Sequence, residues 1–170
     1  DGGGKIPLTS NSPKHLFEIG AQASAAGTIG VLAGQLGLIS RYSRDYPDIP
    51  YLVKLNSKTG MVKTSQRDPV SMAMWDIDDV FTLKDNGINV VGVGYTIYLG
   101  SEYEHDMLTE AATLIRQAHE NGLICVTWIY PRGQAVLDET DPQLISGAAG
   151  LLSASEPISP KSIIPWNFLE

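Results

Sequence analysis

Side chains able to bind anions and transfer protons gather where three apolar runs of the chain end. These ends hold Lys54 and Asn56, then Tyr95, Tyr98, Ser101 and Glu102, and finally Trp128, Tyr130 and Arg132. In an α/β barrel the reactive groups lie at the C-terminal ends of the strands, on one side of the barrel. If the three runs are such strands, their ends form one site. From position alone, Lys54 and Arg132 are candidate contacts for an anion or a hydroxyl group.

Each of these side chains also has a purely structural explanation. Lys54 can be the polar tip of a strand, and Trp128 can pack in a core. Tyr130 can hydrogen-bond a loop, and Arg132 can be a surface charge. Side chains alternate along a strand, so we expect Trp128 and Tyr130 to point to the same face. Arg132 follows Pro131 and belongs to the next loop.

Other residue types that often carry chemistry lack the spacing for it. The three histidines, His15, His105 and His119, lie far apart in helical patterns, so we expect no metal site. No Ser-His-Asp or Cys-His set stands out. The acidic residues at 76, 78 and 79 are typical of a solvated helix face. The single cysteine, Cys125, is typical of a small buried hydrophobic residue.

The elements that must position the site alternate between strands and helices. Apolar runs at 29–33, 51–56, 88–95 and 123–130 predict strands buried on both faces, as in a parallel sheet. Helices are expected from Asp68-Pro69 to residue 86, from about His105 to Asn121, and from Asp141-Pro142 onward. Helix, Asn-Gly and strand recur twice, with the two glycines 35 residues apart. Repeated βα units fit a barrel or a doubly wound sheet, although no GxGxxG follows a strand.

Composition narrows the class of protein. The 170 residues are 43% hydrophobic and 18% charged, the balance of one globular domain. The net charge of -7 disfavours nucleic acid as a partner. No apolar stretch is long enough for a membrane span, and residues 1–5 lack the form of a signal peptide. With one cysteine, these features lead us to expect a cytoplasmic protein without a membrane partner.

Three motifs in order resemble the archaeal-type class I fructose-bisphosphate aldolases. They are Tyr-Leu-Val-Lys-Leu-Asn-Ser-Lys-Thr at 51–59, Val-Gly-Tyr-Thr-Ile-Tyr-Leu-Gly-Ser-Glu-Tyr-Glu at 93–104, and Trp-Ile-Tyr-Pro-Arg-Gly at 128–133. The resemblance covers roughly residues 15–150. It implies an eight-stranded (β/α) barrel that cleaves fructose bisphosphate into two triose phosphates in glycolysis, with no metal or other cofactor.

The resemblance also implies roles for individual residues. A lysine forms a Schiff base with the substrate ketone, and the iminium accepts electrons during carbon–carbon cleavage. Tyr130 matches the family's general acid/base, and Trp128 matches a tryptophan that lines the site. The family lysine follows one βα unit later in a motif like Gly-Ala-Asp-Phe-x-Lys-x-Asn-Tyr-Pro. Lys161 stands at that place, 31 residues after Tyr130.

The sequence departs from the family at three places. No Asp-Gln-x-x-Glu-His motif precedes His15, and the chain stops at Glu170, before the last two strands of the family with their phosphate-binding loops. At 155–165 the chain reads Ser-Glu-Pro-Ile-Ser-Pro-Lys-Ser-Ile-Ile-Pro. Codons that encode these residues, when read one nucleotide earlier, also allow Leu-Gly-Ala-Asp-Phe-Ala-Lys-Ile-Asn-Tyr-Pro, which is the family motif. We therefore hypothesise a frameshift near residues 152–155; the alternative is a divergent tail.

The sequence predicts a partial parallel (β/α)8 TIM barrel over residues 1–152 and an aberrant proline-rich tail over 153–170. The function expected is that of a fructose-bisphosphate aldolase acting through Lys161 and Tyr130, with Trp128, Lys54 and Arg132 nearby. This chain is expected to have little activity. The alternatives are a non-catalytic barrel fragment or interaction module, and a Schiff-base aldolase or transferase for another sugar phosphate. Exposed strand edges predict a homo-oligomer or poor solubility.

Overall fold

The structure, a computed structural model, describes residues 12–155 of the chain. Its elements run in the order α1 (Pro13–Ala25), β1 (Leu32–Gln35), α2 (Leu36–Tyr42), the 3-10 turn η1 (Ser43–Asp45), β2 (Tyr51–Lys54), α3 (Ile77–Asp85), β3 (Val90–Leu99), α4 (Glu104–Glu120), β4 (Ile124–Pro131) and α5 (Pro142–Ser155). Every strand after the first is thus separated from its predecessor by a helix.

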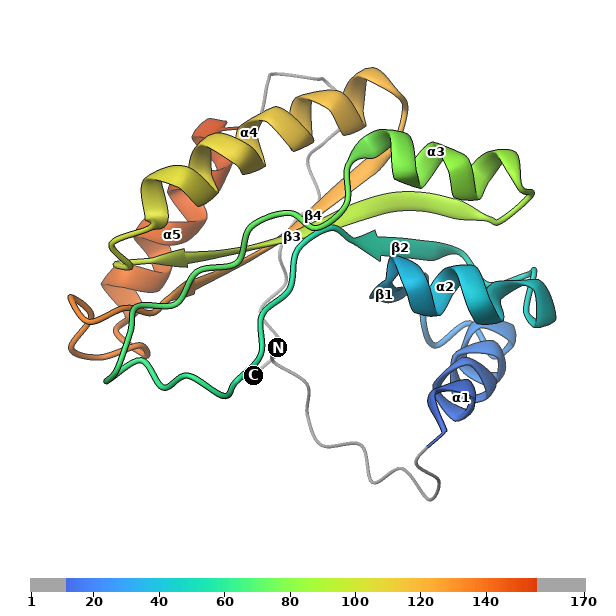
Figure 1. Ribbon diagram of the computed structural model, residues 1–170, viewed down its shortest axis with the longest axis horizontal. Helices are drawn as coiled ribbons and strands as arrows, with labels where there is room; N and C mark the ends of the chain where they lie inside the picture. The colour runs from blue at the N-terminus through green and yellow to red at the C-terminus, as the bar shows by residue number, and fades with distance from the viewer. Residues whose placement is uncertain (1–11, 156–170) are drawn as a thin grey trace.

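The four strands form one parallel sheet in the order β1-β2-β3-β4 (Figure 1). Helix α2 packs on β1 and β2, α3 and α4 pack on β3, and α5 packs on β4. A doubly wound sheet reverses its strand order at a switch point, whereas this sheet adds each new strand on the same side. The predicted barrel winding is therefore confirmed, and the four strands described here leave the barrel open.

The two faces of the sheet differ because side chains alternate along each strand. Val53 and Val93 pair across β2 and β3 and are fully buried in the core. The opposite face carries Lys54 and, across β3 and β4, the register-neighbours Thr96 and Trp128. In a barrel the helices cover the outer face, so the face with Lys54 and Trp128 is the inner one.

Helix α4 is placed as its sequence predicts. Its Met107, Ala111, Leu114, Ile115 and Ala118 recur at helical spacing, and all five are buried. Gly122, just past the helix, has the positive φ of 70° that the predicted left-handed cap requires. The helix from residue 142 is also confirmed.

The helix expected from Asp68 begins only at Ile77, so that prediction is wrong. Asp76 and Asp79 form a reciprocal capping box, with Asp79 N donating to Asp76 Oδ1 at 3.0 Å and Asp76 N donating to Asp79 Oδ2 at 3.1 Å. Asp68 instead lies buried in the preceding segment. The first strand likewise lies at Leu32–Gln35, a few residues later than the run at 29–33 predicted.

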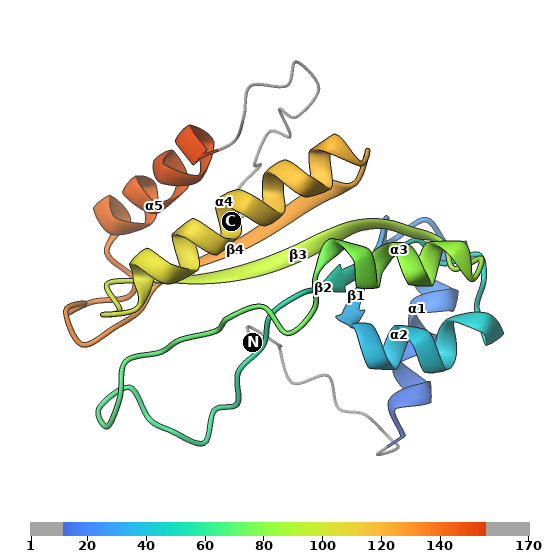
Figure 2. The ribbon, with the colours of Figure 1, turned by 45° about the horizontal axis from the view of Figure 1, so that its top comes forward.

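The long segment between β2 and α3 runs to the C-terminal end of β3 and back to α3 (green in Figure 2). Two polar side chains, the buried Asn56 and the half-buried Glu110, hold this segment in place. Asn56 Nδ2 donates to the carbonyls of Ser71 at 2.7 Å and Thr96 at 2.8 Å. Glu110 of α4 accepts from Ala73 N at 2.7 Å and from the Tyr95 hydroxyl at 2.5 Å.

The end of the described chain bears on the expected domain boundary. Helix α5 continues to Ser155, and the division of the chain after residue 152 stays a prediction. The rest of the tail, with Lys161, lies outside the described residues. No helix between residues 12 and 155 has the length and apolar character that a membrane span needs.

Candidate active site

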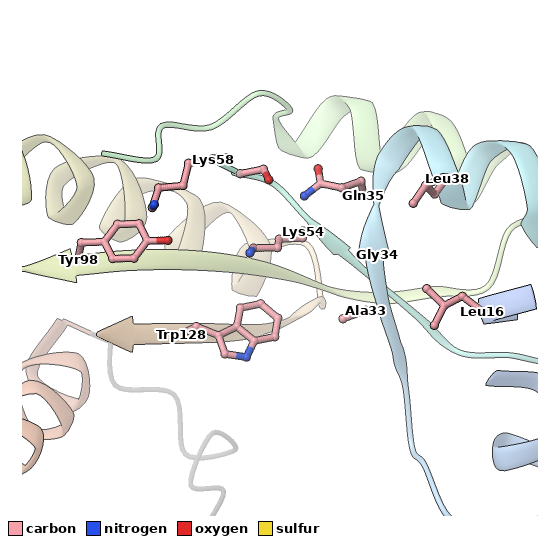
Figure 3. Close-up of a pocket in the computed structure, with 10 residues that line it drawn as sticks. Leu16, Ala33, Gly34, Gln35, Leu38, Lys54, Lys58, Tyr98 and Trp128 are labelled. Atoms are coloured by element: carbon pink, nitrogen blue, oxygen red, sulfur yellow. The ribbon is translucent and has the colours of Figure 1, made fainter. Parts of the chain in front are cut away.

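A cavity of about 340 Å³ opens on the inner face at the C-terminal ends of the strands. Its walls come from every strand and from α1, α2 and the segment after β2, as the side chains labelled in Figure 3 show. The lining residues are Leu16, Ala33, Gly34, Gln35, Leu38, Lys54, Ser57, Lys58, Tyr98 and Trp128. This is the position that sequence analysis predicted for a site.

Lys54 ends β2 and projects its amine into this cavity (Figure 3). Its Nζ lies 5.6 Å from the centroid of the Trp128 ring, within the range of a cation–π contact. Burial lowers the pKa of Lys54, because a low-dielectric wall disfavours the charged amine. None of the ion pairs found among residues 12–155 includes Lys54.

Trp128 reaches this position because its neighbour on β3 has no side chain in the way. A Cβ on Gly94 would lie closest to Trp128 Cζ3 and 2.7 Å from Leu52 Cδ2, too close for either side chain to stay where it is. The ring is half-buried, with one side over the glycine and the other toward the cavity. Both the strand register and the glycine thus position the indole.

Tyr98 and Tyr130 form a stacked aromatic pair on the adjoining strands β3 and β4. They are opposite one another in the register, and their ring centroids are 6.0 Å apart. Lys58 Nζ lies 5.3 Å from the Tyr98 centroid. Burial raises the pKa of Tyr98, an effect that the positive charge of Arg132 partly opposes. Tyr130 is half-buried and Tyr98 is buried, so Tyr130 is the more exposed residue of the pair.

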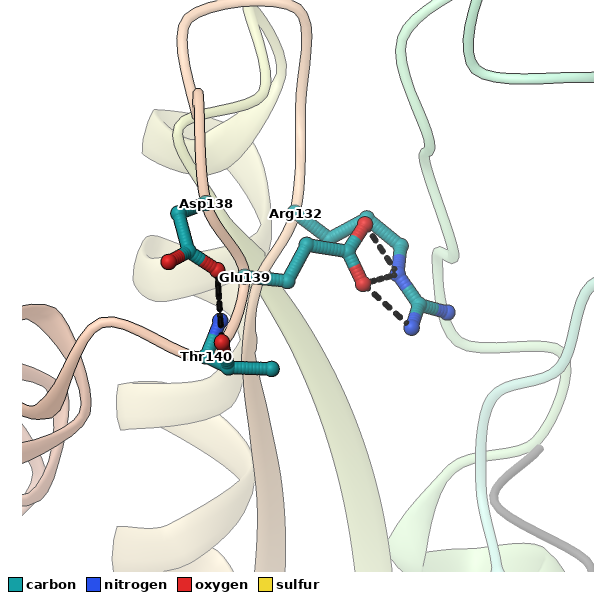
Figure 4. Close-up of polar contacts among 4 residues, drawn as sticks. All are labelled: Arg132, Asp138, Glu139 and Thr140. Atoms are coloured by element: carbon teal, nitrogen blue, oxygen red, sulfur yellow. Dashed lines mark hydrogen bonds and ion pairs between the residues drawn. The ribbon is translucent and has the colours of Figure 1, made fainter.

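Arg132 lies in the loop after β4, with its guanidinium 5.5 Å from the Tyr130 centroid. Figure 4 shows it bonded to Glu139, with Nε 2.9 Å from both carboxylate oxygens and Nη2 2.7 Å from Oε2. These hydrogen bonds raise the pKa of Arg132 further, so it stays charged. In the same loop Asp138 accepts from Thr140. The glutamate takes one edge of the guanidinium and leaves Nη1 for other partners.

The predicted site residues fall into three groups. Lys54 and Trp128 line the cavity. Tyr130 stacks on Tyr98, which also lines the cavity, and the guanidinium of Arg132 lies over the Tyr130 ring. Three strand-end residues serve the scaffold instead: Asn56 and Ser101 bond loop carbonyls, and the Tyr95 hydroxyl bonds Glu110 on the outer face. Lys161 lies outside the described residues.

Three polar lining residues, Gln35, Ser57 and Lys58, were not among the predicted site residues. Gln35 ends β1, which starts later than its apolar run indicated, so its position at a strand end was hidden. Lys58 belongs to an irregular segment, where no periodicity predicts direction. No group of three or more histidine, cysteine, aspartate or glutamate side chains within the described part of the chain could hold a metal ion.

The geometry suits an anionic, hydroxyl-rich ligand. Lys54, Lys58 and Arg132 supply positive charge, each over one aromatic ring, and those rings, Trp128, Tyr98 and Tyr130, supply flat apolar surface with two phenolic hydroxyls. Phosphate groups favour the first kind of contact, and the carbon face of a sugar favours the second. A tyrosine near such a ligand can also transfer a proton.

Comparisons with known proteins agree with this geometry. The family model described as DeoC/LacD family aldolase matches residues 8–156. The chain is 55% identical over 141 residues to a protein of Methanocaldococcus jannaschii named fructose-bisphosphate aldolase/6-deoxy-5-ketofructose 1-phosphate synthase, covering 82% of this chain and 44% of that protein. It is 34% identical over 140 residues to a class 1 fructose-bisphosphate aldolase of Thermoproteus tenax, covering 82% and 48%.

Solved structures give the same result. A fructose-bisphosphate aldolase from Slackia heliotrinireducens superposes with a TM-score of 0.81 at 58% identity, covering 85% of this chain and 44% of that one. An archaeal fructose-1,6-bisphosphate aldolase, with its catalytic lysine covalently bound to the carbinolamine intermediate of the substrate, gives a TM-score of 0.68 at 32% identity, covering 85% and 52%. The chain spans about half the length of the relatives it matches.

Proposed function

Because the chain belongs to the DeoC/LacD family of aldolases, we propose that it forms part of the active site of a class I fructose-bisphosphate aldolase. The observation that carries the proposal is the cavity at the strand ends, where Lys54 and Trp128 meet beside the Tyr98–Tyr130 pair. The relatives named as fructose-bisphosphate aldolases support the substrate.

In the proposed reaction a lysine amine attacks the ketone of fructose bisphosphate and water leaves, forming an iminium ion. Tyr130 takes the proton of the C4 hydroxyl as the C3–C4 bond breaks, and the bonding electrons flow to the iminium as an enamine. One triose phosphate leaves as an aldehyde. Protonation and hydrolysis of the enamine release the other and restore the amine. We assign the amine to Lys161, by its place in the family pattern.

Substrate contacts are proposed for three described side chains. Lys54 and Arg132 bind phosphate or hydroxyl oxygens, and Trp128 covers the carbon face of the sugar. Lys54 is supported by its place in the cavity without a carboxylate partner among the described ion pairs. Arg132 is supported by the edge that Glu139 leaves uncovered. In the cell we place the protein in the cytoplasm and in glycolysis.

A homo-oligomer is also proposed. Leu144, Ile145 and Leu151 of α5 are between 38% and 43% exposed, and Leu137 of the preceding loop is fully exposed. Such apolar surface favours association between copies. Light scattering that shows a stable, well-behaved monomer would contradict this part of the proposal.

The Schiff base is tested by borohydride reduction in the presence of fructose bisphosphate, followed by peptide mass mapping. In this chain we expect only a trace of label at Lys161, because the sequence places Pro160, which cannot donate to a strand ladder, beside it. In a version restored to the shifted frame at 155–165, and extended with the family's remaining strands, we expect stoichiometric label at the motif lysine.

Lys54→Met is the matched control, because Lys54 is a cavity lysine with a lowered pKa. It should leave the site of labelling unchanged and weaken substrate binding. Label on Lys54 rather than at the motif lysine would move the nucleophile to β2 and refute the assignment to Lys161. Absence of label in the restored version would refute the aldolase proposal itself.

A second candidate substrate comes from the name of the Methanocaldococcus relative, which includes 6-deoxy-5-ketofructose 1-phosphate synthase. Both reactions use a sugar phosphate ketone, and a lysine can trap either. Running the labelling experiment with each sugar phosphate in the restored version decides between them.

A further inference from the structure

The carboxylate of Asp68 joins three loops at the C-terminal rim of the sheet. Asp68 lies in the segment between β2 and α3 and is only 8% exposed. Its Oδ2 accepts from Glu102 N, in the loop after β3, at 2.8 Å. Its Oδ1 accepts from Gln134 N, in the loop after β4, at 2.6 Å. One side chain therefore connects three successive βα loops.

The charge of this buried carboxylate is compensated by backbone N–H groups. None of the ion pairs among residues 12–155 includes Asp68. The adjacent Arg67 turns away, with its guanidinium 5.5 Å from the Tyr103 ring centroid. A buried carboxylate without a cation is retained in a fold only when hydrogen bonds offset its desolvation. The two backbone donors are thus held firmly, and they belong to different loops.

The same junction is reinforced by a second side chain. The Ser101 hydroxyl donates to the carbonyl of Pro69 at 2.6 Å and accepts from Tyr103 N at 3.1 Å. Ser101 is itself 4% exposed. The segment after β2 is therefore tied to the loop after β3 by Asp68 and Ser101, and by a longer bond of 3.5 Å from Arg67 Nη2 to the Tyr103 hydroxyl. Among the side-chain hydrogen bonds of residues 12–155, only that of Asp68 ties the segment to the loop after β4.

The loop after β4 is the one that carries Arg132. Arg132 N donates to the carbonyl of Leu99 at 2.7 Å, and two residues later Gln134 N donates to Asp68. Arg132 N is therefore one fixed point of this loop and Gln134 N is the second, while Glu139 holds the guanidinium itself beside the Tyr130 ring. The bond to Asp68 is the only one of the two that depends on a side chain and can be removed by substitution.

We propose that Asp68 is a positioning residue that holds Arg132 in place to bind a phosphate group of the sugar substrate. The inference builds on the proposed function, since it needs a phosphate-bearing ligand in this site. It adds that the affinity for this ligand depends on a carboxylate that never contacts it.

The test compares Asp68→Asn with Asp78→Asn, an equal change of charge at an exposed position of α3. An asparagine keeps the shape but offers one acceptor oxygen where two N–H groups need one each. Calorimetric titration of the full chain with fructose bisphosphate should show affinity weakened about tenfold in Asp68→Asn, a loss typical of one charge-assisted hydrogen bond. The affinity of Asp78→Asn should be unchanged. Amide hydrogen exchange should accelerate at residues 132–136 in Asp68→Asn alone.

A double-substitution cycle separates positioning from general stability. If Asp68 acts through Arg132, then adding Asp68→Asn to Arg132→Gln weakens binding no further. Independent, multiplied losses would overturn the proposal, as would accelerated exchange with unchanged affinity. If the unsubstituted chain does not bind fructose bisphosphate, this inference fails, whereas the proposed function is decided separately by labelling of the restored version. Binding that Asp68→Asn leaves intact refutes only the role of Asp68.

Discussion

Replacing Gly94 by alanine tests the packing that places Trp128 in the cavity. The added methyl carbon would lie closest to Trp128 Cζ3 and 2.7 Å from Leu52 Cδ2, whereas carbon atoms at optimal contact are about 3.5–4.0 Å apart. Overlap of this size in a packed site costs about 2 kcal/mol, within the range for an extra methylene. The lower chain entropy of unfolded alanine offsets about 0.5 kcal/mol. We expect a net loss of about 1.5 kcal/mol, or about 3–6 °C in Tm.

Gly37→Ala is the matched control for Gly94→Ala. Gly37 lies within α2, is exposed, and a Cβ there would meet nothing within 4 Å. Alanine should therefore stabilise the chain by about 0.5–1 kcal/mol. Urea unfolding of both variants, followed by circular dichroism, measures changes of opposite sign from the same chemical substitution.

The cause is identified in a Trp128→Ala background. Without the indole ring, the alanine at position 94 loses two of its three nearest contacts and keeps the one with Leu52 Cδ2, at the end of a flexible side chain, so its penalty should fall by at least half. An equal penalty in both backgrounds would refute the placement of the ring over Gly94. So would a Gly94→Ala variant that is as stable as the parent and binds fructose bisphosphate equally well.

Three further outcomes can be measured on the same chain. Glu110→Gln should lower the unfolding free energy by about 1–2 kcal/mol in urea, because a neutral amide oxygen replaces the carboxylate that accepts from Ala73 N and the Tyr95 hydroxyl. Burial raises the pKa of Tyr51 to about 12. The stability that depends on its neutral hydroxyl is therefore complete below the unfolded pKa near 10 and is lost as pH rises to 12. Tyr51→Phe should flatten this fall of the unfolding temperature at alkaline pH. Lys54→Met should leave the unfolding free energy within about 0.5 kcal/mol of the parent, because the desolvation of the amine offsets its contact with the indole ring. The same substitution should weaken the affinity for fructose bisphosphate measured by calorimetry.

The parts of the fold that sequence predicted are those in which periodicity and burial agree. In α4 the apolar positions recur at helical spacing, and β3 and β4 are continuous apolar runs, so element type followed directly. Strand alternation likewise placed Trp128 and Tyr130 on one face. These signals are local, and packing did not override them.

The predictions that were wrong concern residues whose local pattern indicates one role, while a partner distant in sequence gives them another. Asp68-Pro69 has the form of a helix start, but the Asp68 carboxylate bonds backbone groups 34 and 66 residues away in sequence. Tyr95 stands in the same run as Tyr98, yet strand alternation turns it to the outer face, where Glu110 accepts from it. Neither long-range partner can be found from spacing, and the same holds for the bond between Arg132 and Glu139.

The sequential order of the strands also sets how the chain can fold. Each strand pairs with the next along the chain, so every pairing closes a loop no longer than one βα unit, and loop-closure entropy stays small. The longest ladder joins β3 and β4 across α4, whose buried face packs on both strands. Residues 90–131 thus gain the longest strand pairing of the sheet, with a helix packed on it, by closing a single βα unit. We expect its amides to be the earliest protected during refolding, with β1 and α1 added last, as pulse-labelled hydrogen exchange would show.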